Sequence, residues 1–200
     1  MFEKLFDPKL KILRESSYSY LKLFVLSALI FMGTIIIGIL INQYVAEFAY
    51  QYMLAPTLSI INKIYKIYDY TFLVVLLVFF KNSFAIITCI YFARRTKGVS
   101  LAFLLGLNGI IIGAILIMFY MSGMPLILII AGILPHGIFE FTGVFLGASY
   151  GFKLLFVKEE EINDYKIEVK NKIFKTLIPI LFIAAFVEVY ITPIFMMIVL

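Results

Sequence analysis

The stretch PLILIIAGILPHGIFEFTGVFLGASYG, residues 125–151, decides the fold, because it is long and apolar enough to cross a lipid bilayer as one helix. The rest of the chain has the same character. Of its 200 residues, 64% are hydrophobic and only 14% are charged, and the mean hydropathy is +1.07. A soluble domain of this size could not bury that much apolar surface in one core. The composition therefore predicts an integral membrane protein.

Four further apolar runs reach the roughly 20 residues that a helix needs to cross the hydrocarbon. None of them alternates with period two, as a transmembrane barrel strand would. We therefore predict an all-α fold, a polytopic transmembrane helical bundle that forms a single domain over residues 1–200. The predicted spans are residues 23–41, 71–93, 99–121, 125–151 and 176–200. Between the spans we predict an outer amphipathic segment at the membrane surface over 42–70 and a cytoplasmic linker over 152–175.

Lysine and arginine residues predict the orientation, because cytoplasmic loops are enriched in them. With these spans, 14 of the 17 basic residues fall before the first span, between the second and third, or between the fourth and fifth. We therefore expect a cell-membrane protein with a cytoplasmic N-terminus and an external C-terminus. Basic residues beside membrane helices are explained by topology and by anionic lipid headgroups, so the net charge of +5 does not indicate nucleic-acid binding.

The outer segment 42–70 is rich in tyrosine, which suits the headgroup layer because its ring is buried there while its hydroxyl stays in water. Pro56 divides this segment into two halves. Two interpretations stay open. The segment is either an interfacial connector or a docking surface for an extracytoplasmic partner, such as a cell-envelope protein.

Ionisable side chains inside the spans carry the functional signal, because a charge at membrane depth costs several kcal/mol unless it has a partner. At about 100° per residue, His136, Glu140, Gly143, Gly147 and Gly151 fall within an arc of about 80°. Small residues let membrane helices approach closely, so we expect this stripe to face protein. At a spacing of four residues, the imidazole of His136 and the carboxylate of Glu140 can also touch.

Two other spans repeat this pattern, and the second span adds an asparagine. The predicted intramembrane polar cluster comprises Asn82, Asn108, His136, Glu140 and Glu188. The predicted helix-packing positions are Gly109, Gly113, Gly143, Gly147, Gly151 and Ala184. Helix adjacency cannot be read from one sequence, so the convergence of these residues is an inference.

Three interpretations of the polar cluster compete. The first is a hydrogen-bonded network that fixes helix packing. The second is a path for a proton, a metal or a small solute, in which His136, Glu140 and Glu188 are the candidate metal ligands. The third is an intramembrane hydrolase that uses His136 and Glu140 for acid–base chemistry. The sequence has no second histidine and no hydrolase or phosphate-loop motif. We therefore assign no catalytic residue and expect no cofactor, and a bound metal stays open.

Four short motifs in the right order resemble the stage II sporulation protein M family. They are Lys81-Asn82, Leu107-Asn108-Gly109 with Gly113, Leu134-Pro135-His136-Gly137 with Glu140, and Ala184-Ala185-Phe186 with Glu188, Thr192 and Pro193. The Pro-His-Gly element with its downstream glutamate is the specific part. The similarity extends over residues 70–195, and the family's common Asn-Asn pair is Asn82-Ser83 here.

The resemblance implies a non-enzymatic membrane scaffold with five spans and a cytoplasmic N-terminus. The founding member acts in engulfment during endospore formation, where it holds peptidoglycan-degrading enzymes at the septal membrane. From the small-residue stripes we expect a protein that assembles with itself or with other membrane proteins among the membrane lipids. The alternative is a transporter or channel whose polar cluster moves a proton, a metal or a small solute.

Overall fold

The computed structural model describes residues 8–42, 44, 51 and 71–199, and every regular element in this part of the chain is helical. Five of its segments are long and apolar enough to span a membrane, which confirms the predicted all-α membrane fold. The outer segment predicted over 42–70 lies outside the described residues except at Asn42, Tyr44 and Gln51. In chain order the elements are α1 (Pro8–Leu40), α4 (Thr71–Phe92), α5 (Val99–Met121), α6 (Leu126–Lys153), η3 (Glu159–Glu161), α7 (Ile162–Lys172), η4 (Ile173–Leu177), α8 (Ile178–Phe186), η5 (Val187–Ile191) and α9 (Thr192–Val199).

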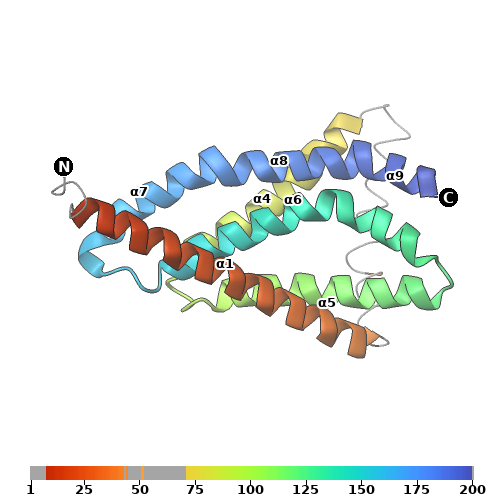
Figure 1. The fold of residues 1–200 in the computed structure, drawn as a ribbon, viewed down its shortest axis with the longest axis horizontal. Coiled ribbons are helices and arrows are strands. Elements are labelled where there is room, and N and C mark those ends of the chain that lie inside the picture. The colour runs from red at the N-terminus through yellow and green to blue at the C-terminus, as the bar shows by residue number, and fades with distance from the viewer. Residues whose placement is uncertain (1–7, 43, 45–50, 52–70, 200) are drawn as a thin grey trace.

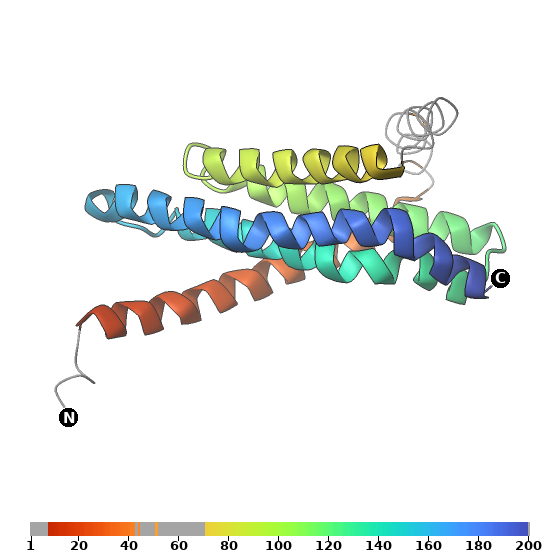
Figure 2. The same cartoon turned by 90° about the horizontal axis from the view of Figure 1, so that it is seen from above.

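The spans run roughly along one axis (Figure 1). The start of α1, the α4–α5 connection and α7 lie at one end of the bundle, and α9 ends at the other (Figure 2). Helix α6 is central, because it contacts α1, α4, α5, α8 and α9. Helix α1 runs obliquely and leaves the bundle at its N-terminal end (Figure 2).

Glycines hold α1 against α5, which is its most extensive neighbour. A Cβ atom added to Gly113 would collide with the backbone carbonyl of Ile35, and one added to Gly38 would collide with the carbonyl of Ile110. The two backbones are therefore in direct contact. Close backbone approach of this kind favours helix association in membranes, where lipid removes the hydrophobic drive.

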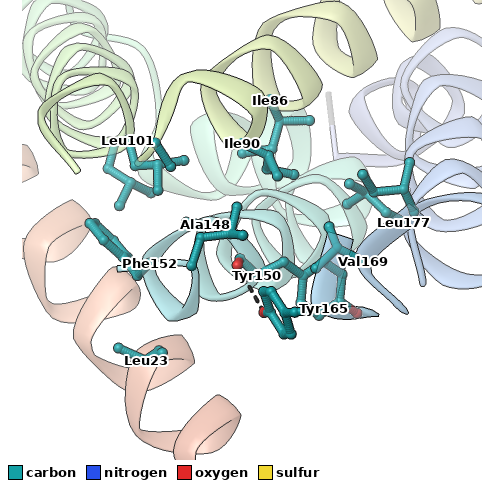
Figure 3. Close-up of a cluster of buried hydrophobic side chains, with 14 of the residues drawn as sticks. Leu23, Ile86, Ile90, Leu101, Ala148, Tyr150, Phe152, Tyr165, Val169 and Leu177 are labelled. Atoms are coloured by element: carbon teal, nitrogen blue, oxygen red, sulfur yellow. Dashed lines mark hydrogen bonds between the residues drawn. The ribbon is translucent and has the colours of Figure 1, made fainter. Parts of the chain in front are cut away.

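The main apolar core lies where α4, α5, α6 and η4 meet. Ile86 and Ile90 of α4, Leu101 of α5 and Leu177 of η4 are almost completely buried there, and they surround Ala148 of α6 (Figure 3). Large aliphatic side chains from three elements thus converge on a small residue of the central helix. This packing places the polar positions of α4 and α6 on one side of the bundle.

The last helical segment begins earlier in the chain than the predicted last span. Residues 152–175, expected as a linker, include helix α7, which continues through η4 into α8. The reason is a buried face: Ile162, Tyr165, Val169 and Ile173 are buried, and their spacing of three or four residues places them on one side of a helix. The glutamates and lysines of this segment lie between them. The many charged residues of this segment indicated a linker. The regular spacing of its buried apolar residues explains why it forms a helix instead.

The other helix ends lie close to their predicted positions, with one exception. Helix α1 begins at Pro8, although the first span was predicted from residue 23. Proline suits the first turn of a helix because no intrahelical acceptor is lost there. Only the part from Tyr20 to Leu40 is apolar enough to cross a membrane. Lys9, Lys11 and Arg14 therefore belong to the same helix.

A compact polar group lies at the α7 end of the bundle. We call it the tyrosine cluster, and it comprises Tyr20, Tyr150, Lys153, Tyr165, Glu168 and Lys172. The Tyr20 hydroxyl donates to the Tyr165 hydroxyl over 3.1 Å. The Tyr165 hydroxyl donates to the Tyr150 carbonyl over 3.0 Å, as Figure 3 shows. The ammonium groups of Lys153 and Lys172 lie 3.9 Å and 3.7 Å from the centre of the Tyr20 ring. The cluster joins α1, α6 and α7.

Candidate functional site

The five residues of the predicted polar cluster all line one cavity of about 330 Å³, which we call the polar cavity. Helices α4, α5 and α6 and the π-helical segment η5 form its walls. Glu140 and Glu188 are half-buried in it. The described lining residues are Val78, Lys81, Asn82, Asn108, Ile112, Ile115, Gly132, Ile133, His136, Glu140, Phe141 and Glu188.

Irregular helix geometry flanks the polar residues on two sides of this cavity. Pro135 lies inside α6, directly before His136, and removes the N–H group that would bond the carbonyl four residues earlier. Glu188 lies in η5, where the N–H of Thr192 donates to the Val187 carbonyl five residues back. Single π-helical turns of this kind occur frequently at functional sites. The helix is therefore irregular where its carboxylate enters the cavity.

His136 and Glu140 do not bond to each other. The Asn82 side-chain amide donates to Oε1 of Glu140 over 3.0 Å, and Nδ1 of His136 lies 3.1 Å from Oγ1 of Thr192. The spacing of four residues within α6 allowed a direct bond, but partners on α4 and α9 form these bonds instead. One ligand atom from each of His136, Glu140 and Glu188 nevertheless lies within 4.8 Å of the other two.

Asn108 takes a different position from the rest of the predicted cluster. Its side chain is largely exposed and its amide donates to the Leu104 carbonyl of its own helix over 2.8 Å. It borders the polar cavity but forms no hydrogen bond with the other four residues. The structure thus brings His136, Glu140 and Glu188 together, places Asn82 beside them and leaves Asn108 at the wall.

The predicted packing positions divide into two groups. Gly109 and Gly113 of α5 face the backbone of α1. The α6 glycines instead receive side chains: a Cβ on Gly143 would lie 2.7 Å from Leu181, one on Gly147 would lie 2.5 Å from Ile86, and one on Gly151 would lie 2.7 Å from Leu101. Ala184 is buried. Both groups allow close packing, but only the first brings two backbones together.

Two residues of the site were not assigned to it from the sequence. Lys81 lines the cavity, although its charge next to Asn82 was read only as part of a motif. Thr192 is buried and donates its hydroxyl to the Val187 carbonyl over 3.2 Å while its oxygen faces His136. The signal for Thr192 was present, because it lies four residues after Glu188 and therefore on the same face of the helix.

The arrangement can hold a cation or exchange protons, because it combines an imidazole with two carboxylates in a confined space. Lys81 lies close enough to act electrostatically on both Glu140 and Glu188, although it forms no ion pair with either in the described structure. The two carboxylates therefore keep bonding capacity that neighbouring side chains do not use.

The chain is similar to known proteins of one family. Residues 27–193, from within α1 to the start of α9, match the family Stage II sporulation protein M. An uncharacterised protein of Methanocaldococcus jannaschii is 36% identical over 120 residues, which cover 56% of this chain and 67% of that protein. No solved structure matches the chain. Because the family match covers all five membrane-spanning segments, the chain belongs to the stage II sporulation protein M family.

Proposed function

We propose that this integral membrane protein is a non-enzymatic scaffold, which assembles with itself or with other membrane proteins and holds cell-envelope enzymes at the membrane. The observation that carries the proposal is the family match over residues 27–193. In spore formers the corresponding enzymes would be those that remodel peptidoglycan. The match does not favour the alternative, a transporter or channel.

The exposed apolar surface supports an assembly role. Within the chain, only between 17% and 33% of the most apolar window of each span is buried, and the lowest value belongs to α1. Helix α1 presents an outward ridge with a spacing of three or four residues, formed by Leu21, Val25, Leu29, Met32, Ile36 and Leu40. Lipid or a second protein must cover such a ridge in the membrane.

Charge supports the proposed orientation. The described basic residues outside the apolar windows gather at the α7 end of the bundle, in the α4–α5 connection and from Lys153 to Lys175. In this orientation that end is cytoplasmic, and the C-terminus and the outer segment are external. An external outer segment suits a partner that works on the cell envelope.

Photo-crosslinking in native membranes tests the scaffold. A photoreactive residue is placed at Leu29 or Ile36 on the α1 ridge, and at Phe84 or Phe103 on the exposed surfaces of α4 and α5. Ser27 provides the control, because it is completely buried within the chain. The scaffold predicts a discrete protein adduct from at least one exposed surface, either with a second copy or with an envelope enzyme, and none from Ser27.

A second experiment tests whether the crosslinked partner needs the scaffold for its position in the membrane. Deleting the gene should disperse a fluorescently labelled partner from its membrane site, and the wild-type gene should restore it. Lipid adducts at every exposed position, together with a monomer by native mass spectrometry, would overturn the proposal. Normal partner localisation in the deletion strain would overturn it as well.

A further inference from the structure

We propose that His136, Glu140 and Glu188 form a binding site for a divalent transition-metal ion of the zinc class inside the membrane-spanning bundle. One ligand atom from each lies within 4.8 Å of the others, and all three residues line the same cavity of about 330 Å³. The inference stands on this geometry and is independent of the scaffold role.

The hydrogen bonds of His136 leave one ring nitrogen free for a metal. The Thr192 hydroxyl donates its proton to the Val187 carbonyl over 3.2 Å, so its oxygen is available only as an acceptor toward Nδ1 of His136, which lies 3.1 Å away. In this arrangement Nδ1 carries the proton, and Nε2 has a free lone pair. Metal-binding histidines are held in this way, with the second nitrogen donating to an oxygen.

The carboxylates of Glu140 and Glu188 also have oxygens that can bind a metal. Asn82 donates to one oxygen of Glu140 over 3.0 Å, which orients the group and leaves the other oxygen free. Glu188 is half-buried, lines the cavity and has no hydrogen-bond partner among the described residues. A divalent cation would offset both negative charges at a depth where each is expensive.

The distances and ligand types indicate which ion fits. Zinc binds histidine nitrogen and carboxylate oxygen at about 2.0–2.2 Å, so tetrahedral ligands lie about 3.4 Å apart. The observed limit of 4.8 Å requires a small closure, which glutamate side chains provide by rotation. The imidazole favours zinc, iron or nickel over magnesium or calcium, which prefer oxygen ligands alone. Three protein ligands leave a fourth position for water.

Metal binding to the full-length protein in detergent tests the site. Protein stripped with a chelator is loaded with Zn²⁺, passed over a desalting column and analysed for zinc per chain by mass spectrometry. We expect one tightly held zinc ion in the wild type, and loss of it in Glu140→Gln, Glu188→Gln and His136→Ala. Glu160→Gln is the matched control, because it removes an exposed carboxylate outside the cavity.

A substitution beside His136 distinguishes loss of metal binding from loss of the fold. Thr192→Val keeps the side-chain shape but removes the oxygen that faces His136, so zinc affinity should fall by about 10- to 100-fold, while circular dichroism should show that the metal-free variant keeps its helical fold. Wild-type protein without stoichiometric zinc would overturn the proposal, and this result does not depend on any variant folding. Equal zinc in wild type and Glu188→Gln, or binding of Mg²⁺ in place of Zn²⁺, would also overturn it.

Discussion

The tyrosine cluster and the polar cavity both collect polar side chains from several helices, but they use them differently. In the tyrosine cluster, the hydroxyls of Tyr20 and Tyr165 bond within the cluster, and Lys172 pairs with Glu168 over 2.7 Å. In the polar cavity, Glu188 has no described hydrogen-bond partner and open space lies beside it. Polar groups that serve packing are normally satisfied. The polar cavity also joins helices, through Asn82 with Glu140 and through His136 with Thr192, but it keeps unused hydrogen-bonding capacity at Glu188.

The polar cavity also depends on how its wall is held. Ile112, Ile115 and Asn108 of α5 line it, while Gly109 and Gly113 of the same helix contact α1. Helix α5 has far more extensive contact with α1 than with α6. The glycine contact therefore keeps α5 beside α1, and the space between α5 and α6 stays open at the level of His136.

The largest expected effect comes from Gly113→Ala, which tests this wall. The added Cβ atom would collide with the Ile35 carbonyl, so the helices must separate, and we expect a loss of about 3 kcal/mol in the free energy of unfolding. Gly33→Ala is the control, since nothing lies within 4 Å of its Cβ position. Thermal unfolding in one detergent compares them. Equal stability of the two variants would contradict the backbone contact.

Tyr165→Phe tests the tyrosine cluster, in which the hydroxyls are hydrogen-bonded to one another. It removes a hydroxyl that bonds both Tyr20 and the Tyr150 carbonyl, and leaves those two groups without that partner. We expect a loss of about 1–2 kcal/mol, measured by the same unfolding assay. Tyr91→Phe, at an exposed position, should leave the unfolding temperature unchanged. If both variants behave alike, the tyrosine cluster does not stabilise the α7 end.

Glu188→Gln should raise the free energy of unfolding, whereas the two preceding substitutions lower it. In metal-free protein the substitution replaces a half-buried carboxyl group, which faces the like charge of Glu140 and has no ion-pair partner among the described residues, by a neutral amide, so we expect a gain of about 1 kcal/mol in the presence of chelator. Glu160→Gln, at an exposed site, should show no change. A loss of stability as large as that of Tyr165→Phe would mean that Glu188 belongs to a packing network. The distinction between the two regions would then fail.

Lys172→Met should have the smallest effect. The ammonium lies 3.7 Å from the centre of the Tyr20 ring and pairs with Glu168, but the side chain is partly exposed, so its loss should cost about 0.5 kcal/mol. High salt should reduce the difference from wild type, because it screens exposed charges. Lys170→Met provides a control at an exposed position of the same helix. A salt-independent loss would point to packing of the side-chain stem instead.

Much of the fold could be predicted from local sequence. The third span, residues 99–121, agrees with α5 at both ends, and the fourth differs from α6 by only one or two residues at either end. The linker prediction missed α7 because charge was weighed above the period of Ile162, Tyr165, Val169 and Ile173. Apolar length is a property of neighbouring residues and needs no knowledge of the other helices.

The sequence predicted which polar residues border the cavity, but not which hydrogen bonds they form. All five polar residues border one cavity, yet Asn108 bonds its own helix, and Glu140 bonds Asn82 rather than His136. A helical projection predicts which residues share a face. It does not say how far each helix is rotated or shifted against its neighbours.

The approximate spans, the apolar character and the family follow from residue type and spacing along the chain, so they can be inferred without knowing how the helices pack. Three features could be found only in the folded bundle: Thr192 lies beside His136, the α6 glycines receive side chains, and a cavity lies beside Glu188. These features depend on the relative rotation and offset of packed helices. Contacts between distant parts of the chain set those quantities.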